Sequence, residues 1–194
     1  MCDKGLSSAE IRSPAAIIQL GRLYHLSMLL RPAEPADALA VARVHVRSWQ
    51  TAYRNLLPND YLDQLRPEDR AQKYTLASPN PLDPYTIVAA EDGVIHGFAT
   101  TAPARDPDVP SFGELYALYV EPDHWGRGIG VALISAARVH LVDLGFKSAV
   151  LWVLAGNVRA ERFYRLDHWT ADGHRRSDEV WGVAVNELRY QRTL

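Results

Sequence analysis

The stretch YVEPDHWGRGIGVALISAARVHLVDLG, residues 119–145, places three glycines within five positions and then continues with a helical pattern. Helices disfavour glycine because it loses the most backbone entropy on folding, so Gly126, Gly128 and Gly130 need another explanation. The first turn of a helix presents free backbone N–H groups and the positive end of the helix dipole, and glycines let a ligand approach them. The stretch therefore predicts an anion-binding loop, to which Arg127 adds positive charge.

Two common phosphate-binding loops do not fit this stretch. The dinucleotide-binding fingerprint requires G-x-G-x-x-G, but Val131 stands where its third glycine belongs. The Walker loop requires G-K-[ST] at its end, and no such tripeptide follows the glycines. The glycines alone therefore leave a tight turn without a ligand as an open alternative.

The composition is that of an ordinary globular domain. The chain has 194 residues, of which 47% are hydrophobic and 23% charged, enough for one sizeable core. Its formal net charge of −2 gives no support for binding to nucleic acid or to a membrane surface. Its apolar runs are shorter than the roughly 20 residues that a membrane span needs. Cys2 is the single cysteine, so no disulfide can form within the chain, and we expect a cytoplasmic protein.

The chain divides at Met28, where the strong periodic pattern begins. We expect residues 28–194 to form one domain and residues 1–27 to be an extension outside the fold. The open alternative is a genuine N-terminal helix that packs on the domain. Residues 1–27 show no clean signal-peptide pattern of charged, apolar and small residues.

Hydrophobic periodicity and turn residues predict interleaved helices and strands. In chain order we expect a strand at 29–31, a helix with Pro35 in its first turn, one or two helices within 56–78, a hairpin at 85–101 that turns at Asp92-Gly93, a strand at 114–120, a helix at 128–145, a buried strand at 148–154, a helix at 157–166, and strands at 169–176 and 185–192. The charged segment 174–182 is expected at a hairpin tip. Because a helical crossover joins the strands at 114–120 and 148–154, these two should be parallel, which predicts a single α/β or α+β domain.

The segment LYVEPDHWGRGIG, residues 118–130, resembles motif A of the GCN5-related N-acetyltransferases, whose pattern is Q/R-x-x-G-x-G/A after a bulged strand. Trp125 departs from the pattern by standing where the family has Gln or Arg. A second segment, NVRAERFY at 157–164, is similar to the family's N-x-x-A-x-x-F-Y. The 34 residues from Gly130 to Tyr164 are close to the family spacing, and the resemblance covers about residues 29–194.

The resemblance implies a fold and a cosubstrate. The fold is a mixed, mostly antiparallel sheet, split at a bulged strand and flanked by helices. The cosubstrate is acetyl-CoA, with its pyrophosphate in the glycine loop and its pantetheine arm beside the bulged strand, where a backbone N–H would polarise the thioester. The positions expected to bind it are Leu118, Tyr119, Val120, Gly126, Arg127, Gly128, Ile129, Gly130, Val131 and Asn157. Asn157 is also a candidate N-cap of the helix that follows it, and both roles can hold together. The seven histidines show no metal-ligand spacing, so we assign no metal.

Two residues are candidates for acid–base chemistry. By the resemblance, Tyr164 is the general acid that protonates the leaving sulfur; the alternative is a core aromatic beside Phe163. Glu114 is the candidate base, since several family members carry a glutamate at this position, and strand alternation places it on one face with Tyr116 and Leu118. The alternatives for Glu114 are a solvated charge at the strand entry, or a water that removes the proton.

Trp49, Tyr53 and Tyr61 lie on or after the first helix, which borders the acceptor groove in this family, although core packing also explains them. Segment 174–182 could also reach over that groove. The resemblance thus implies acetyl transfer to a primary amine of a small molecule or a protein N-terminus, by direct attack in a ternary complex. The rivals are a coenzyme A-binding regulatory protein without turnover, and an acyltransferase with another donor or a non-amine acceptor. We expect a monomer or homodimer; the acceptor is left open.

Overall fold

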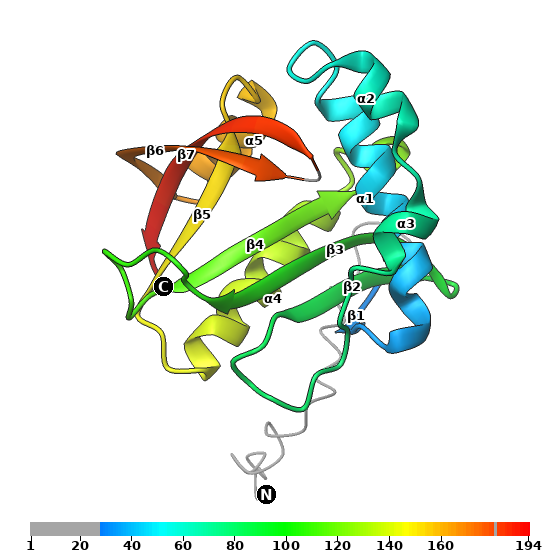
Figure 1. Cartoon of the computed structure of the whole chain (residues 1–194). Helices are drawn as coiled ribbons and strands as arrows, with labels where there is room; N and C mark the ends of the chain where they lie inside the picture. The colour runs from blue at the N-terminus through cyan, green and yellow to red at the C-terminus, as the bar shows by residue number, and fades with distance from the viewer. Residues whose placement is uncertain (1–27, 181) are drawn as a thin grey trace, which may run out of the picture.

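The computed structural model describes residues 28–180 and 182–194, so the expected extension at 1–27 lies outside the described residues. Within this part of the chain, seven strands form one sheet in the order β1-β2-β3-β4-β5-β7-β6 (Figure 1). The strands are β1 (Leu29–Pro32), β2 (Tyr85–Glu91), β3 (Val94–Pro103), β4 (Gly113–Val120), β5 (Ser148–Leu154), β6 (Thr170–Val180) and β7 (Val183–Thr193). The helices are α1 (Ala38–Ala52), α2 (Asn59–Gln64), α3 (Pro67–Ala71), α4 (Ile129–Asp143) and α5 (Val158–Leu166), with 3-10 turns at Pro35–Asp37 and Pro122–His124.

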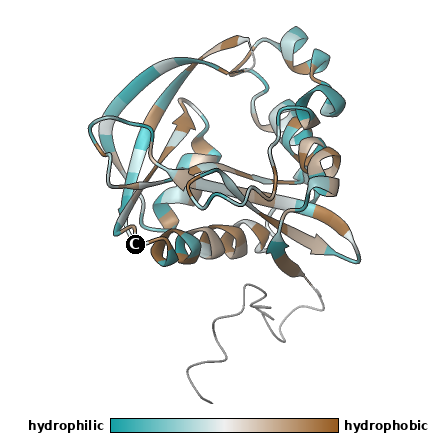
Figure 2. Ribbon diagram, turned by 60° about the horizontal axis from the view of Figure 1, so that its bottom comes forward, coloured by the Kyte–Doolittle hydropathy of each residue, from teal (hydrophilic) through white to brown (hydrophobic). Residues whose placement is uncertain are grey.

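The helices cover both faces of the sheet. On one face α4 buries Leu133, Ile134 and Leu141 against the central strands. On the other, α1 buries Val41 and Val44 against β2 and β3. In Figure 2 the brown, apolar residues gather on α4 and on the strands that it covers. None of the helices that the structure describes is long and apolar enough to cross a membrane.

Local signals place the element boundaries where the sequence predicts them. Pro35 opens the 3-10 turn that leads into α1. The hairpin of β2 and β3 turns at Asp92 and Gly93, both with positive φ, which glycine and aspartate tolerate better than bulkier residues. Gly145 follows α4 with φ of 93°, the left-handed conformation that ends many helices.

The sheet divides between β4 and β5, its one parallel pair among the described strands. These strands pair only at Gly113 and Glu114, opposite Ala149 and Val150, and then diverge. On its other edge β4 is bulged, because Thr100 pairs with Ala117 and Thr101 with Leu115, which leaves Tyr116 without a partner. The expected fold, a mixed and mostly antiparallel sheet split at a bulged strand, is confirmed.

The bulge overturns the expected face of β4. Leu115 and Leu118 both pack in the core under α4, whereas Ala117 and Tyr119 pack on the α1 side. The extra residue at the bulge shifts the alternation by one, so Glu114, which precedes Leu115, does not share a face with Leu118.

The expectation that 174–182 forms a hairpin tip is wrong over most of that segment. Residues 174–180 belong to β6, which pairs with β7 as far as Val180 and Val183. β6 is an edge strand of the sheet, so its charged residues reach solvent while its backbone stays paired with β7.

Candidate active site

The divergence of β4 from β5 opens a cleft of about 1350 Å³. The glycine loop, which follows β4, and the first turn of α5, which follows β5, line its open end. Glu114 and Trp152 line it near the closed end, where the two strands still pair. The predicted anion loop and the predicted base therefore lie on one continuous surface.

The glycine loop needs glycine for its backbone conformation. Gly126 and Gly128 have φ of 76° and 83°, and a Cβ at either would meet no other atom within 4 Å. Gly128 caps α4, whose first main-chain bond runs from the Ala132 N–H to the Gly128 carbonyl at 3.0 Å. The amides of residues 129–131 therefore lack an intrahelical acceptor and face the cleft end as donors.

Trp125 ties this loop to its surroundings. Its indole N–H donates to the carbonyl of Val120 at 2.7 Å, and the guanidinium of Arg159 lies 3.4 Å from the centre of its ring. The Val120 carbonyl also accepts the Ser48 hydroxyl at 3.0 Å, so it is already occupied, which limits the strand groups open to a ligand. Arg159 was not a sequence candidate, because its partner Trp125 lies on a different element.

Asn157 caps α5 and also lines the cleft. Its side-chain oxygen accepts the Ala160 N–H at 3.1 Å, which confirms the helix cap, and the residue lines the cleft. A carboxamide also carries two N–H donors, so the cap leaves donor capacity for a ligand.

Tyr164 lies on α5, is 9% exposed and lines the cleft. Burial, with a smaller contribution from Tyr119, raises the pKa of Tyr164 far above its ordinary value. Its hydroxyl therefore stays protonated at neutral pH, as a proton donor must.

The aromatic residues on and after α1 only partly follow the sequence expectation. Trp49 and Tyr53 are buried and also line the cleft, where the Trp49 indole N–H donates to the Tyr119 hydroxyl at 3.0 Å. The hydroxyls of Tyr53 and Tyr119 are 3.4 Å apart. Tyr61 packs with the same cluster but is not among the residues that line the cleft.

Glu114 is 2% exposed, which rules out a solvated charge at the strand entry. Arg105, from the loop before β4, forms an ion pair with Oε1 at 3.3 Å, and its backbone N–H lies 3.4 Å from Oε2. Burial raises the pKa of Glu114 above its ordinary value, while Arg105 opposes the rise. A buried carboxyl with a raised pKa at the closed end of a cleft is typical of a functional base.

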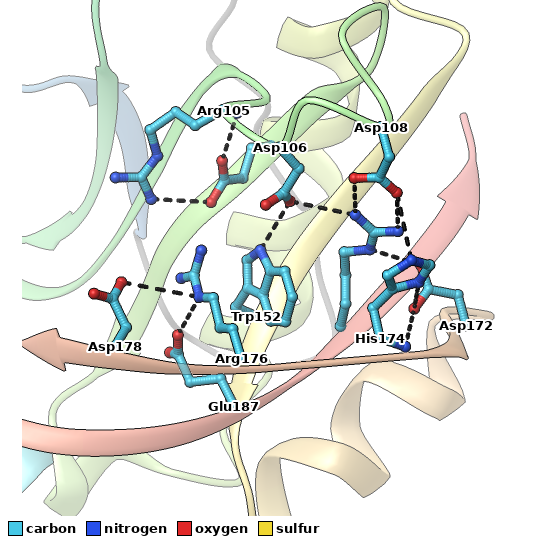
Figure 3. A network of polar contacts seen from close by, with 11 residues as sticks. Arg105, Asp106, Asp108, Trp152, Asp172, His174, Arg176, Asp178 and Glu187 are labelled. Atoms are coloured by element: carbon cyan, nitrogen blue, oxygen red, sulfur yellow. Dashed lines mark hydrogen bonds and ion pairs between the residues drawn. The ribbon is translucent and has the colours of Figure 1, made fainter.

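A polar network beside Glu114 was missed by sequence reasoning (Figure 3). Arg189 of β7 is 3% exposed and donates to Asp108 at 2.8 and 2.6 Å and to Asp172 at 2.7 Å. The Trp152 indole N–H donates to Asp106 at 3.0 Å. These bonds fix the loop that carries Arg105, and no local pattern could reveal them because the partners are distant in sequence. Among the residues that the structure describes, no group of three His, Cys, Asp or Glu is placed to hold a metal ion.

The fold and this cleft agree with the comparison to known families. The model of the acetyltransferase (GNAT) family matches residues 46–168, which is more than half of the chain. The chain belongs to this family and is an acetyltransferase.

Individual relatives point the same way. The N-acetyltransferase YuaI of Bacillus subtilis is 34% identical over 128 residues, which cover 66% of this chain and 72% of YuaI. A mycothiol acetyltransferase of Propionibacterium freudenreichii is 38% identical over 84 residues; the match spans 42% of this chain and only 27% of that protein. The PaiA N-acetyltransferase of Thermoplasma acidophilum, solved in complex with coenzyme A, shares the fold with a TM-score of 0.68 at 19% identity, over 87% of this chain and 100% of PaiA.

Proposed function

We propose that the protein transfers the acetyl group of acetyl-CoA to a primary amine by direct attack in a ternary complex. One observation carries the proposal: a single cleft joins the anion loop at its open end to a buried glutamate near its closed end. The GNAT relatives support the acetyl donor, and the amine is the acceptor that a buried carboxylate base suits.

The residues present fit coenzyme A. The amides at the start of α4 and the side chain of Arg159, which lines the cleft, suit its phosphates, whereas the exposed Arg127 is not among the residues that line it. Beyond Glu114, β4 has no strand partner on its β5 edge, and the main-chain groups of Leu118 point to this edge, because those of the neighbouring Tyr119 point toward β3. Asn157 faces the same cleft from the start of α5.

The chain's own groups supply the proton transfers. Acetyl-CoA, when bound, brings the acetyl group as a reactive thioester with a thiolate as leaving group. Glu114 accepts the proton of the acceptor ammonium, which frees the amine to attack. Tyr164 donates its hydroxyl proton to the sulfur as the carbon–sulfur bond breaks. The nitrogen that has attacked releases its second proton as the amide forms, and this proton restores the Tyr164 hydroxyl through solvent, while Glu114 returns its own proton to solvent. Burial of both groups keeps bulk water from competing for these protons.

The test is release of free thiol from acetyl-CoA in the presence of single amines. The panel holds free amino acids, their amides, a peptide with a free N-terminus, a polyamine and an aminoglycoside. We expect thiol release that depends on the amine, with one acetyl group gained by the acceptor in mass spectrometry.

Two outcomes would contradict the proposal. Tight binding of acetyl-CoA without release for any amine would favour a regulatory protein without turnover. Faster reaction with longer acyl-CoA donors would favour another acyl donor. A cytoplasmic location and a monomeric or homodimeric state are further proposals, to be tested by fractionation and by light scattering.

A further inference from the structure

We infer that the acceptor is a free amino acid, or a similar small amine with a carboxylate next to its amine, and that Arg105 binds this carboxylate. The inference rests on the proposed function, because it concerns the second substrate of the same cleft. The feature that carries it is the ion pair of Arg105 and Glu114 near the closed end of the cleft.

The contacts of Arg105 orient its guanidinium but leave part of it accessible from the cleft. Its guanidinium lies 4.2 Å from the centre of the Tyr116 ring, and one Nη contacts Glu114 at 3.3 Å. Within the residues that the structure describes, its contacts are with Glu114 and Tyr116 alone, and the side chain is 62% exposed, so N–H groups remain open to the cleft. An arginine with a fixed plane and free N–H groups is well suited to grip a carboxylate through two bonds.

The loop that presents Arg105 is held firmly. The next residue, Asp106, accepts from Trp152 and lies 3.6 Å from Arg189, and Asp108 is paired with Arg189 by two short bonds (Figure 3). Arg189 is buried and the Asp108 side chain is 46% exposed, so the loop is held through a buried guanidinium at the cleft wall. The position of Arg105 is thus set before an acceptor arrives, which lowers the entropy lost on binding.

The charges of this pair are complementary to those of an amino acid: a carboxylate for its ammonium and a guanidinium for its carboxylate. Glu114 and Arg105 approach within 3.3 Å, and an amino acid carries its ammonium and its carboxylate on one carbon atom. An acceptor can therefore place its amine beside Glu114 and its carboxylate beside Arg105 at the same time. A peptide N-terminus would offer Arg105 a neutral amide instead of an anion.

The other charged groups near this end do not favour a polycation. Arg176 of β6 lines the same cleft as Arg105, and it is paired with Glu187 at 2.8 Å (Figure 3). Glu114 thus pairs with Arg105, and Glu187 and Asp178 both pair with Arg176, at 2.8 and 3.9 Å; of the acidic residues of β6 that line the cleft, the exposed Glu179 is the one with no ion pair among the described residues. A polyamine would need carboxylates without such partners, so the mixed charge favours a zwitterion.

The test compares free amino acids with their primary amides, for example L-leucine and L-phenylalanine against L-leucinamide and L-phenylalaninamide. kcat/KM is measured by thiol release for the wild type, Arg105→Gln and Arg105→Lys. We expect the wild type to prefer the free acid by about 10- to 100-fold, the range of a hydrogen bond between charged groups. Arg105→Gln should remove most of that preference, and Arg105→Lys should keep part of it. Comparing ratios between variants cancels the different basicities of acid and amide amines.

Arg43→Gln is the matched control, because Arg43 is exposed on α1 and is not among the residues that line the cleft. It makes the same charge change and should leave the preference unaltered. Equal loss of rate for acid and amide in Arg105→Gln would mean that Arg105 acts only on Glu114, and would overturn the inference.

The wild type alone can also contradict the inference, so a variant that fails to fold does not remove the test. If peptides, amides or polyamines react as well as free amino acids, the acceptor assignment is wrong while the acetyltransferase proposal stands. If no amine is acetylated, the proposed function and the inference both fail.

Discussion

Gly128→Glu should reduce the affinity for acetyl-CoA by at least about 100-fold, a loss of about 2.8 kcal/mol of binding free energy. Gly128 has φ of 83° and caps α4 where the free amides begin, so the new side chain would occupy the anion site with a like charge. Any non-glycine residue would also strain this left-handed backbone, by about 1–2 kcal/mol. Isothermal titration calorimetry measures the affinity, and circular dichroism checks the fold.

Gly145→Glu separates the two effects, because Gly145 lies at the other end of α4 with φ of 93° and open space around it. It should lower the melting temperature through the same backbone strain, yet bind acetyl-CoA as the wild type does. A folded Gly128→Glu protein with normal affinity would remove the glycine loop from the binding site.

Tyr164→Phe should lower kcat by about 10²–10⁴-fold, the usual contribution of a positioned proton donor. The phenyl ring keeps the packing against Phe163 and Trp169, and only the hydroxyl is lost. The affinity for acetyl-CoA should change little, since the proton is needed only as the thiolate leaves. Steady-state kinetics by thiol release measures kcat, and calorimetry measures the affinity.

Tyr190→Phe is the control for loss of a buried hydroxyl. Tyr190 is 2% exposed and is not among the residues lining the cleft; its hydroxyl bonds Glu161 and Arg165 at 3.1 Å each. It should lose stability but keep kcat. An unchanged kcat in Tyr164→Phe would show that water or the acceptor protonates the sulfur.

The elements that were predicted correctly have their causes close by in the sequence. Asp92-Gly93 turns a hairpin, Asn157 caps α5, and the evenly spaced glycines end in the first turn of α4. Each of these signals depends on residues that are close together in the chain, so it can be recognised from the sequence alone. The parallel pairing of β4 and β5 followed from the helix that joins them.

The features that were missed depend on contacts between distant segments. The bulge that moves Leu118 to the α4 face arises from the register between β4 and β3. Arg105 is placed by a loop that Arg189 anchors through Asp108, a residue 81 positions away. The charged residues of 174–180 predict a loop, although they belong to a strand, because both faces of an edge strand can be exposed to water. None of these contacts leaves a periodic pattern.

The dependence of kcat on pH, compared between the wild type and Glu114→Gln with one amine acceptor, tests the central claim most directly. Burial raises the pKa of Glu114, and a base must be deprotonated, so wild-type kcat should fall as the pH drops through that raised pKa. Glu114→Gln should lack this inflection. Its deficit should be largest at low pH and shrink as the pH nears the pKa of the amine, which then loses its proton unaided. A variant profile that keeps the wild-type inflection, with a constant small deficit, would contradict Glu114 as the base.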